Sequence, residues 1–137
     1  MNRWLLDTSA LLALRDDEDG AERVAGLLAQ GQRGEARCFG CFITLMEVFY
    51  RIWKDEGELE GKLAYAQCLA LPIEWLHESP ELLQAAARMK ATQRLSLADA
   101  WIAAAAELKA ATLVHKDPEF VAVSLPQLAL PFKPRTG

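Results

Sequence analysis

Short apolar runs alternate along this chain with longer stretches in which apolar and polar residues recur at helical spacing. Each apolar run is as long as a typical buried strand. These runs cover residues 3–7 (RWLLD), 36–43 (ARCFGCFI), 71–76 (LPIEWL) and 112–115 (TLVH), and residues 128–131 (LALP) are a candidate short fifth strand.

The intervening stretches predict helices over residues 8–15, 22–30, 44–56, 59–70, 80–90 and 96–110. Gly57 ends the third of them, and Ser79 with Pro80 suits the N-cap and first turn of the fifth. The last helix is rich in alanine, which has the highest helix propensity of all residues.

Strands separated by helices predict an α/β fold with a mostly parallel sheet whose two faces are both covered. The 137 residues suffice for one domain with its own core, and neither a repeat nor a low-complexity linker divides them. Residues 131–137 are expected to form a loose C-terminal tail.

The composition argues against a membrane protein and against a broadly basic DNA-binding protein. No apolar run approaches the roughly 20 residues that a membrane span requires, and no signal peptide is evident, so we expect a cytoplasmic protein without a membrane partner. The 15 Lys and Arg against 19 Asp and Glu give a net charge of −4, which argues against a surface coated with positive charge for duplex binding. A nucleic-acid enzyme whose metal ions supply local positive charge is compatible with this balance.

Cys38 and Cys41 (CFGC) have the spacing of half a redox or zinc site, but no second pair exists. Because they lie in an apolar strand, we interpret them as small hydrophobic residues. With Cys68 the count is three, an odd number that does not suggest a disulfide framework.

Four acidic residues are crowded by apolar sequence, namely Asp7, Glu47, Asp99 and Asp117. Each has a local explanation as a helix cap. Asp7 precedes the helix at residue 8, and Asp117 precedes a proline, as at many helix starts. Thr44-Leu-Met-Glu47 and Ser96-Leu-Ala-Asp99 each fit a capping box.

Together the four acids indicate a shared site. In a parallel sheet the carboxyl ends of strands and the amino ends of returning helices gather at one edge, where such folds bind ligands. Helix dipoles offset only about 0.3–1 kcal/mol per charge, whereas a cluster of carboxylate oxygens suits Mg²⁺ or Mn²⁺. Setting these four acids aside leaves 15 acidic against 15 basic residues, so two divalent ions would neutralise the net charge of −4.

Three stretches resemble the PIN-domain nucleases, and most closely the VapC-type toxins of bacterial and archaeal toxin–antitoxin pairs. In chain order they are LLDTSALLAL, ITLMEVFYRI and RLSLADAWIAAAAELKAATLVHKDPEF. The third is the most specific, with an acid in the first turn of an alanine-rich helix, then a strand, then an acid before an aromatic residue. The likeness covers nearly the whole chain.

The resemblance implies a three-layer α/β/α sandwich and a ribonuclease that depends on Mg²⁺ or Mn²⁺. Attack on phosphorus by a hydroxide that the metal ions make available would leave a 5′-phosphate and a 3′-hydroxyl. The resemblance also implies a cognate antitoxin that blocks the site, and a homodimer. The catalytic and metal-binding residues it implies are Asp7, Glu47, Asp99 and Asp117. The hydroxyl of Thr8 or Ser9 would orient a carboxylate or a water molecule.

His115 departs from the family pattern, which has Thr or Ser two residues before the last acid. We expect His115 either to contact phosphate or to orient Asp117, and Glu119 either to support Asp117 or to substitute for it. Candidate contacts for flanking phosphates are Arg15, Arg51 and Lys116.

Other functions stay open. A metal-free ribonuclease would use imidazoles, and the chain offers only His77 and His115. A phosphatase of the haloacid dehalogenase type needs a second acid where Ser9 stands. Two further alternatives are a non-catalytic PIN-like module that binds a protein, and a PIN nuclease that processes RNA without an antitoxin.

Overall fold

The computed structural model describes residues 1–133. In this part of the chain five strands form one parallel sheet in the order β3-β2-β1-β4-β5, as the alternation of strands and helices predicts. The strands are β1 (Asn2–Leu6), β2 (Ala36–Cys41), β3 (Glu74–Leu76), β4 (Thr112–His115) and β5 (Gln127–Ala129). The helices are α1 (Thr8–Arg15), α2 (Ala21–Gln32), α3 (Phe42–Glu56), α4 (Glu58–Ala70), α5 (Pro80–Thr92), α6 (Leu97–Leu108) and the short 3₁₀ helix η1 (Pro118–Phe120).

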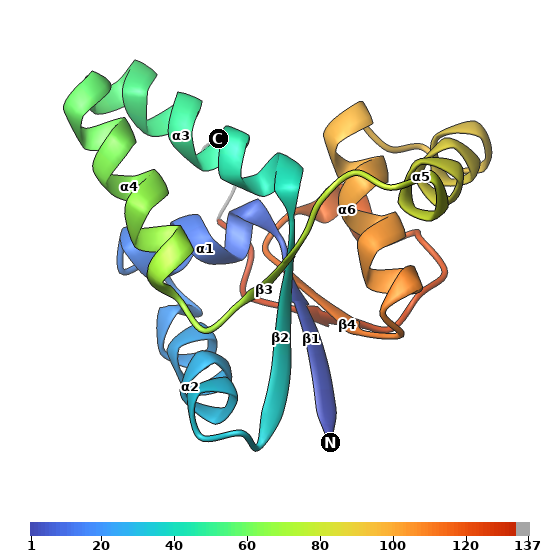
Figure 1. Cartoon of the computed structure of the whole chain (residues 1–137), viewed down its shortest axis with the longest axis horizontal. Helices are drawn as coiled ribbons and strands as arrows, with labels where there is room; N and C mark the ends of the chain where they lie inside the picture. Colours follow the sequence, from blue (N-terminus) through green and yellow to red (C-terminus); the bar gives the residue numbers. More distant parts are fainter. Residues whose placement is uncertain (134–137) are drawn as a thin grey trace.

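The sheet is covered on both faces, which makes the domain the predicted three-layer α/β/α sandwich. In Figure 1 helices α1 to α4 lie on one side of β1 and β2, and α5 and α6 lie on the other. Successive strand residues point to opposite faces, so Leu5 of β1 joins one core cluster and Leu6 joins the other.

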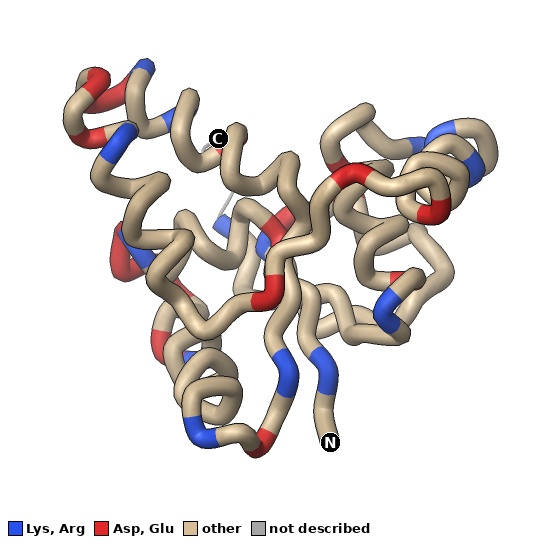
Figure 2. Tube along the Cα trace, viewed as in Figure 1, with Lys and Arg blue, Asp and Glu red and all other residues tan. Residues whose placement is uncertain are grey.

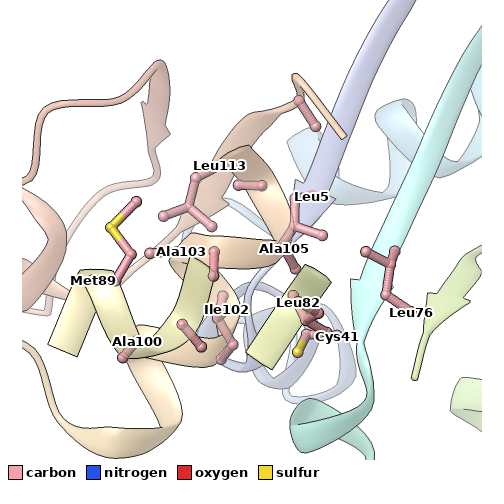
Figure 3. Packing of buried hydrophobic residues seen from close by; sticks show 14 of the residues in the cluster. Leu5, Cys41, Leu76, Leu82, Met89, Ala100, Ile102, Ala103, Ala105 and Leu113 are labelled. Carbon is pink, nitrogen blue, oxygen red and sulfur yellow. The ribbon is translucent and has the colours of Figure 1, made fainter. Parts of the chain in front are cut away.

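The first core cluster lies between the sheet and helices α5 and α6. Figure 3 shows Ala103 and Ala105 of α6 in this cluster together with Leu5 of β1 and Leu113 of β4. The side chains of residues 103–106 are completely buried. Residues 100–106 of α6 are all apolar, and a helical segment that is apolar all round can be enclosed in this way. This buried segment supports the acid in the first turn of α6.

The second core cluster lies between the other face of the sheet and helices α1 to α4. Helices α3 and α4 form a hairpin that turns at Gly57, where φ is 110°. They pack closely at Gly61, where a Cβ atom would lie 2.9 Å from the backbone oxygen of Phe49. The hairpin fixes the orientation of α3, which carries Glu47.

Helix α3 corrects one of the local predictions. It begins at Phe42, two residues before the predicted start, and Cys41 holds the N-cap position without a side-chain hydrogen bond. The predicted capping box from Thr44 to Glu47 is therefore wrong, and Glu47 lies in the second helical turn instead of the first. The Thr44 hydroxyl lies 3.0 Å from that of Thr8, so a tertiary contact replaces the local one.

The remaining helices begin and end within two residues of the predicted bounds. Strand β3 is shorter than predicted, since its pairing with β2 begins only at Glu74, after Pro72, which has no N–H to donate. Strand β5 ends at Ala129, whereas residues 128–131 were predicted. Pro131 likewise cannot extend the hydrogen-bonded ladder.

The part of the predicted tail that the structure describes makes contacts with the domain. Phe132 lies with its ring centroid 6.2 Å from that of His115, and Lys133 forms an ion pair with Glu18 at 2.6 Å. Residues 134–137 lie outside the described residues.

The described helices contain no segment that is both long and apolar enough to cross a membrane. All three cysteines are buried and free, as expected for hydrophobic core residues. Burial raises the pKa of the Cys41 thiol to about 11, so this group is not the thiolate that a redox or zinc site requires.

Candidate active site

Asp7 lies where β1 passes into α1, and it caps α1 as predicted. Its Oδ2 atom accepts a hydrogen bond from the Ser9 backbone N–H at 3.0 Å and another from the Ser9 hydroxyl. The Ser9 hydroxyl oxygen in turn accepts the N–H of Lys116 at 2.8 Å, which joins the end of β1 to the end of β4. The other carboxylate oxygen, Oδ1, is buried and has no hydrogen-bond partner among residues 1–133.

Glu47 reaches the same edge of the sheet from α3. The Thr8 hydroxyl donates to Glu47 Oε1 at 2.7 Å, and Arg51 Nη2 lies 3.2 Å from Glu47 Oε2. Both Glu47 and Thr8 are buried. The structure thus gives the Thr8 hydroxyl to Glu47 and the Ser9 hydroxyl to Asp7.

Asp99, Asp117 and Glu119 form a compact acidic group. One carboxylate oxygen from each lies within 4.8 Å of the others. Ser96 caps α6 by accepting the Asp99 N–H at 3.2 Å, as predicted. The Ser96 N–H bonds to Glu119, whereas a capping box would direct it to Asp99, and this leaves the Asp99 carboxylate facing the other two acids.

Asp117 caps the short helix η1, in agreement with its local prediction. Its Oδ1 atom accepts the Glu119 N–H at 2.9 Å. This bond and the one between Ser96 and Glu119 connect the end of β4 to the start of α6. Glu119 therefore supports the Asp117 turn and also brings its own carboxylate to the group.

Acids from different elements raise one another's pKa values. Burial, followed by the negative charges of Glu47 and Asp117, raises the pKa of Asp7 to about 6, although the two bonds from Ser9 act in the opposite direction. Burial, followed by hydrogen bonding with Glu119 and the charge of Asp7, raises the pKa of Asp99 well above its ordinary range. Ionising all of these carboxylates together requires a source of positive charge.

The donor set fits a hard divalent cation. The free oxygen of Asp7 is an orphaned buried acceptor, and the other group offers carboxylate oxygens within a few ångströms of one another. In the described part of the chain no Lys or Arg forms an ion pair with Asp7, Asp99 or Asp117. A metal ion would supply the charge that the protein itself does not.

His115 is completely buried at the end of β4, behind the acids. Burial lowers the pKa of its imidazole, so the neutral form is favoured. A side chain with no exposed surface has no route to a phosphate group, and the geometry favours the alternative in which His115 orients Asp117.

A cavity of about 680 Å³ opens beside the acids and includes Ser9 and Asp117 in its wall. Arg51 and Lys54 of α3 also line it, and no sequence pattern had pointed to Lys54. The other two predicted phosphate contacts also have partners within the protein, as Arg51 has Glu47. The side chain of Lys116 is 5% exposed and donates to the backbone oxygen of Asp19, and that of Arg15 pairs with Glu56.

In the view of Figure 2 the Lys and Arg positions of the described residues are interspersed along the trace with Asp and Glu and are not gathered on one side. The arrangement agrees with the net charge of −4, which argues against a broad basic surface for duplex binding. Arg51 places one positive charge beside the acids through its ion pair with Glu47.

Several solved structures share this fold. A VapBC2 complex from Rickettsia felis, bound to a DNA fragment from its promoter, superposes with a TM-score of 0.75 at 17% identity and covers 94% of this chain and 99% of that chain. A DNA-bound VapBC from Salmonella typhimurium gives a TM-score of 0.75 at 17% identity, covering 94% and 98%. Mycobacterium tuberculosis VapC20, a sarcin-ricin loop cleaving toxin, gives 0.70 at 19% identity, covering 89% and 95%.

No curated protein matches the sequence significantly. The model of the PIN domain family, in contrast, matches residues 4–125, a range that runs from β1 past η1 and contains all of the acids described above. The match covers most of the sequence. The chain therefore belongs to the PIN domain family.

Proposed function

We propose that this protein is a divalent-metal-dependent endoribonuclease and the toxin of a toxin–antitoxin pair. The observation that carries the proposal is the convergence at one edge of the sheet of acids that form no ion pair with Lys or Arg among residues 1–133, and two of them, Asp7 and Asp99, are buried. The free Oδ1 atom of Asp7 and the group of Asp99, Asp117 and Glu119 are its central parts. Mg²⁺ or Mn²⁺ is the cation that this set of oxygen ligands favours.

In this proposal Asp7, Glu47, Asp99 and Asp117 hold the metal. When bound, a divalent ion lowers the pKa of a coordinated water and stabilises charge on the phosphodiester oxygens. The protein's own part is to hold these carboxylates in place. Ser9 fixes the Asp7 carboxylate, Thr8 fixes that of Glu47, and Glu119 supports the Asp117 turn.

The 680 Å³ cavity beside the acids is the proposed entrance for the RNA strand. Arg51 and Lys54 on its wall would contact phosphates that flank the cleaved bond. The expected products are a 5′-phosphate and a 3′-hydroxyl, because attack by water on phosphorus expels the 3′ oxygen. His115 does not act as the base in this scheme, since it is enclosed.

The toxin role is supported by the fold shared with VapBC complexes and by apolar surface on this chain. A cavity of about 260 Å³ between α1, α3 and α4 is lined largely by apolar residues, including Leu11, Val48 and Leu71. Met46, Tyr50 and Trp53 of α3 are also substantially exposed. We assign such surface to a cognate antitoxin and to a homodimer partner.

Cleavage of total RNA by the purified protein tests the nuclease assignment. The reactions contain wild type, Asp99→Asn or the matched variant Glu107→Gln, which changes an exposed acid near the other end of α6. Each is run with Mn²⁺ and with EDTA, and the product ends are sequenced. We expect discrete cuts with 5′-phosphates from wild type and Glu107→Gln, and none from Asp99→Asn or with EDTA.

Full activity of Asp99→Asn would overturn the site assignment. Absence of cutting by wild type, combined with no change in its melting temperature on adding Mn²⁺, would favour the non-catalytic PIN-like module. The search would then move to its protein partner. Metal-dependent cutting by a protein that no antitoxin inhibits would favour a PIN nuclease of RNA processing.

A further inference from the structure

We propose that His115 and Gln127 form a positioning pair that holds Asp117 in the acidic site through one defined tautomer of the imidazole. The inference rests on the proposed function, since it assigns the pair a role toward the proposed metal centre. The pair joins β4 to β5 directly behind the acids. Gln127 was found by the structure alone.

The orientation of the Gln127 amide is determined by its neighbours. Its Nε2 group donates to two backbone oxygens, that of Phe120 at 2.7 Å and that of Val123 at 2.8 Å. Both amide hydrogens are therefore used. The reversed amide would place an oxygen against two carbonyl oxygens, so Oε1 must be the atom that faces His115.

This orientation determines the imidazole in turn. Gln127 Oε1 lies 2.9 Å from His115 Nε2 and can only accept, so Nε2 carries the hydrogen. On the other side of the ring the Asp117 N–H points at His115 Nδ1 at 3.2 Å, and Nδ1 must therefore be free to accept. Both bonds are satisfied only by the neutral imidazole with its hydrogen on Nε2.

The ring has no freedom to adopt another arrangement. Its side chain is completely buried, and the Phe120 ring lies with its centroid 5.1 Å away. The backbone of His115 is held as well, since its oxygen accepts the Leu130 N–H at 2.8 Å. The pair is thus rigid and fully hydrogen-bonded, as is typical of groups that orient a ligand to a metal.

Fixing the Asp117 backbone also fixes the acids around it. Asp117 accepts the Glu119 N–H, and Glu119 binds the Ser96 N–H at the start of α6. A shift of the Asp117 turn would therefore move two carboxylates relative to Asp99. His115 touches none of the reacting atoms in this scheme, and it acts only through Asp117.

The tautomer can be measured by long-range ¹H–¹⁵N correlation spectra of the untagged, metal-free protein at neutral pH. The chain has two histidines, and the variant His115→Asn assigns the signals. We expect His115 to show a single tautomer with the hydrogen on Nε2. A signal from the tautomer with its hydrogen on Nδ1, or averaging between the two tautomers as in a free imidazole, would overturn the proposal.

Three variants test the positioning role. His115→Leu removes the acceptor for the Asp117 N–H, and His115→Asn retains an oxygen at the equivalent position. Gln127→Leu removes one of the two partners that select the tautomer, the other being the Asp117 N–H. We expect His115→Leu to lose protection of the Asp117 amide from hydrogen exchange and to bind Mn²⁺ about tenfold to a hundredfold more weakly in calorimetric titration. His115→Asn should restore both. Gln127→Leu, in which the Asp117 N–H alone favours the hydrogen on Nε2, should show that tautomer together with a smaller signal from the other.

Circular dichroism verifies that each variant is folded before it is compared. If His115→Leu does not fold, the contrast between wild type, His115→Asn and Gln127→Leu decides the question. Unchanged Asp117 exchange and Mn²⁺ affinity in a folded His115→Leu would overturn the pair. If wild type binds no Mn²⁺, the proposed metal centre is wrong. The tautomer of His115 and the hydrogen exchange of the Asp117 amide still test whether His115 and Gln127 hold Asp117 in place.

Discussion

The hydroxyl of Thr8 donates a hydrogen bond of 2.7 Å to the carboxylate of Glu47, from the first residue of α1 to the second turn of α3. Both residues are buried, and they are 39 positions apart in the chain. This bond aligns two helices that lie on the same face of the sheet. It also replaces the local cap that the sequence around Glu47 suggests.

Substituting Thr8 by Val, which has nearly the same shape, tests this bond. The Glu47 carboxylate would lose a donor in a buried place, and we expect the free energy of unfolding to fall by about 1.5–3 kcal/mol, the usual range for a bond to a charged group. Urea unfolding measures this change. Thr8→Ser keeps the hydroxyl and should recover most of the loss. A larger loss in Thr8→Ser than in Thr8→Val would mean that the packing of the methyl group matters and the hydrogen bond does not.

Mn²⁺ should stabilise the folded protein, because a metal ion relieves the repulsion between the clustered carboxylates and binds the native state only. At a concentration one hundred times the dissociation constant, the gain in unfolding free energy is about 2.7 kcal/mol. Differential scanning calorimetry with and without Mn²⁺ measures it. Glu107→Gln should respond as wild type does, and Asp99→Asn should respond little or not at all. Equal responses from all three proteins would place the metal elsewhere.

Asp7 predicts a pH dependence of stability in the metal-free protein. Its pKa is 3.8 in the reference state and about 6 in the fold, so between these values the folded state binds more protons than the unfolded state does. Stability therefore falls as the pH rises through this window, by about 3 kcal/mol in total for Asp7 alone. Below pH 3.8 Asp7 is protonated in both the folded and the unfolded state, so it no longer lowers the free energy of unfolding.

Asp7→Asn isolates this contribution. Asparagine keeps the acceptor for the Ser9 N–H and is as good an N-cap as aspartate, but it does not ionise. Urea unfolding in EDTA from pH 4 to pH 7 should give a free energy that declines less steeply for the variant than for wild type. Parallel curves would show that Asp7 ionises in the fold without cost.

At Gly61 the substitution of glycine by alanine, which usually stabilises a helix, should destabilise the protein. Alanine is preferred to glycine in helices by about 0.8–1.0 kcal/mol, but here a Cβ atom would lie 2.9 Å from the Phe49 oxygen and 3.0 Å from the Trp53 Cβ. Overpacking costs about 1–3 kcal/mol, so Gly61→Ala should lower the melting temperature. Gly26→Ala in α2 meets no atom within 4 Å and should raise it. Stabilisation by both variants would contradict the close packing of α3 on α4.

The fold could be read from the sequence because its signals are local. Strand and helix periodicities repeat over a few residues, and the parallel arrangement follows from their alternation. The caps at Asp7, Ser96 and Asp117 were predicted for the same reason. The failure at Thr44 has the opposite cause, since a tertiary partner took the hydroxyl that the local pattern had assigned to a cap.

The candidate site divides in the same way. That Asp7 and Asp99 lie near each other follows from strand ends and helix starts meeting at one edge of a parallel sheet. The catalytic roles of these acids stay a prediction. The sequence could not predict which basic side chains are free to contact a phosphate. The Lys116 ammonium group, for example, donates to the backbone oxygen of Asp19 because of tertiary packing, which leaves no periodic signal in the sequence.

By itself, then, the sequence determined the order of strands and helices and the presence of acids at one sheet edge, since both depend on spacing along the chain. Only the tertiary structure decided which hydroxyl serves which carboxylate, that Glu119 binds Ser96, and that Gln127 selects the His115 tautomer. These are contacts between residues 2 to 39 positions apart. They are chosen by the packing of whole elements against one another, and hydrogen-bond geometry then allows a single set of partners.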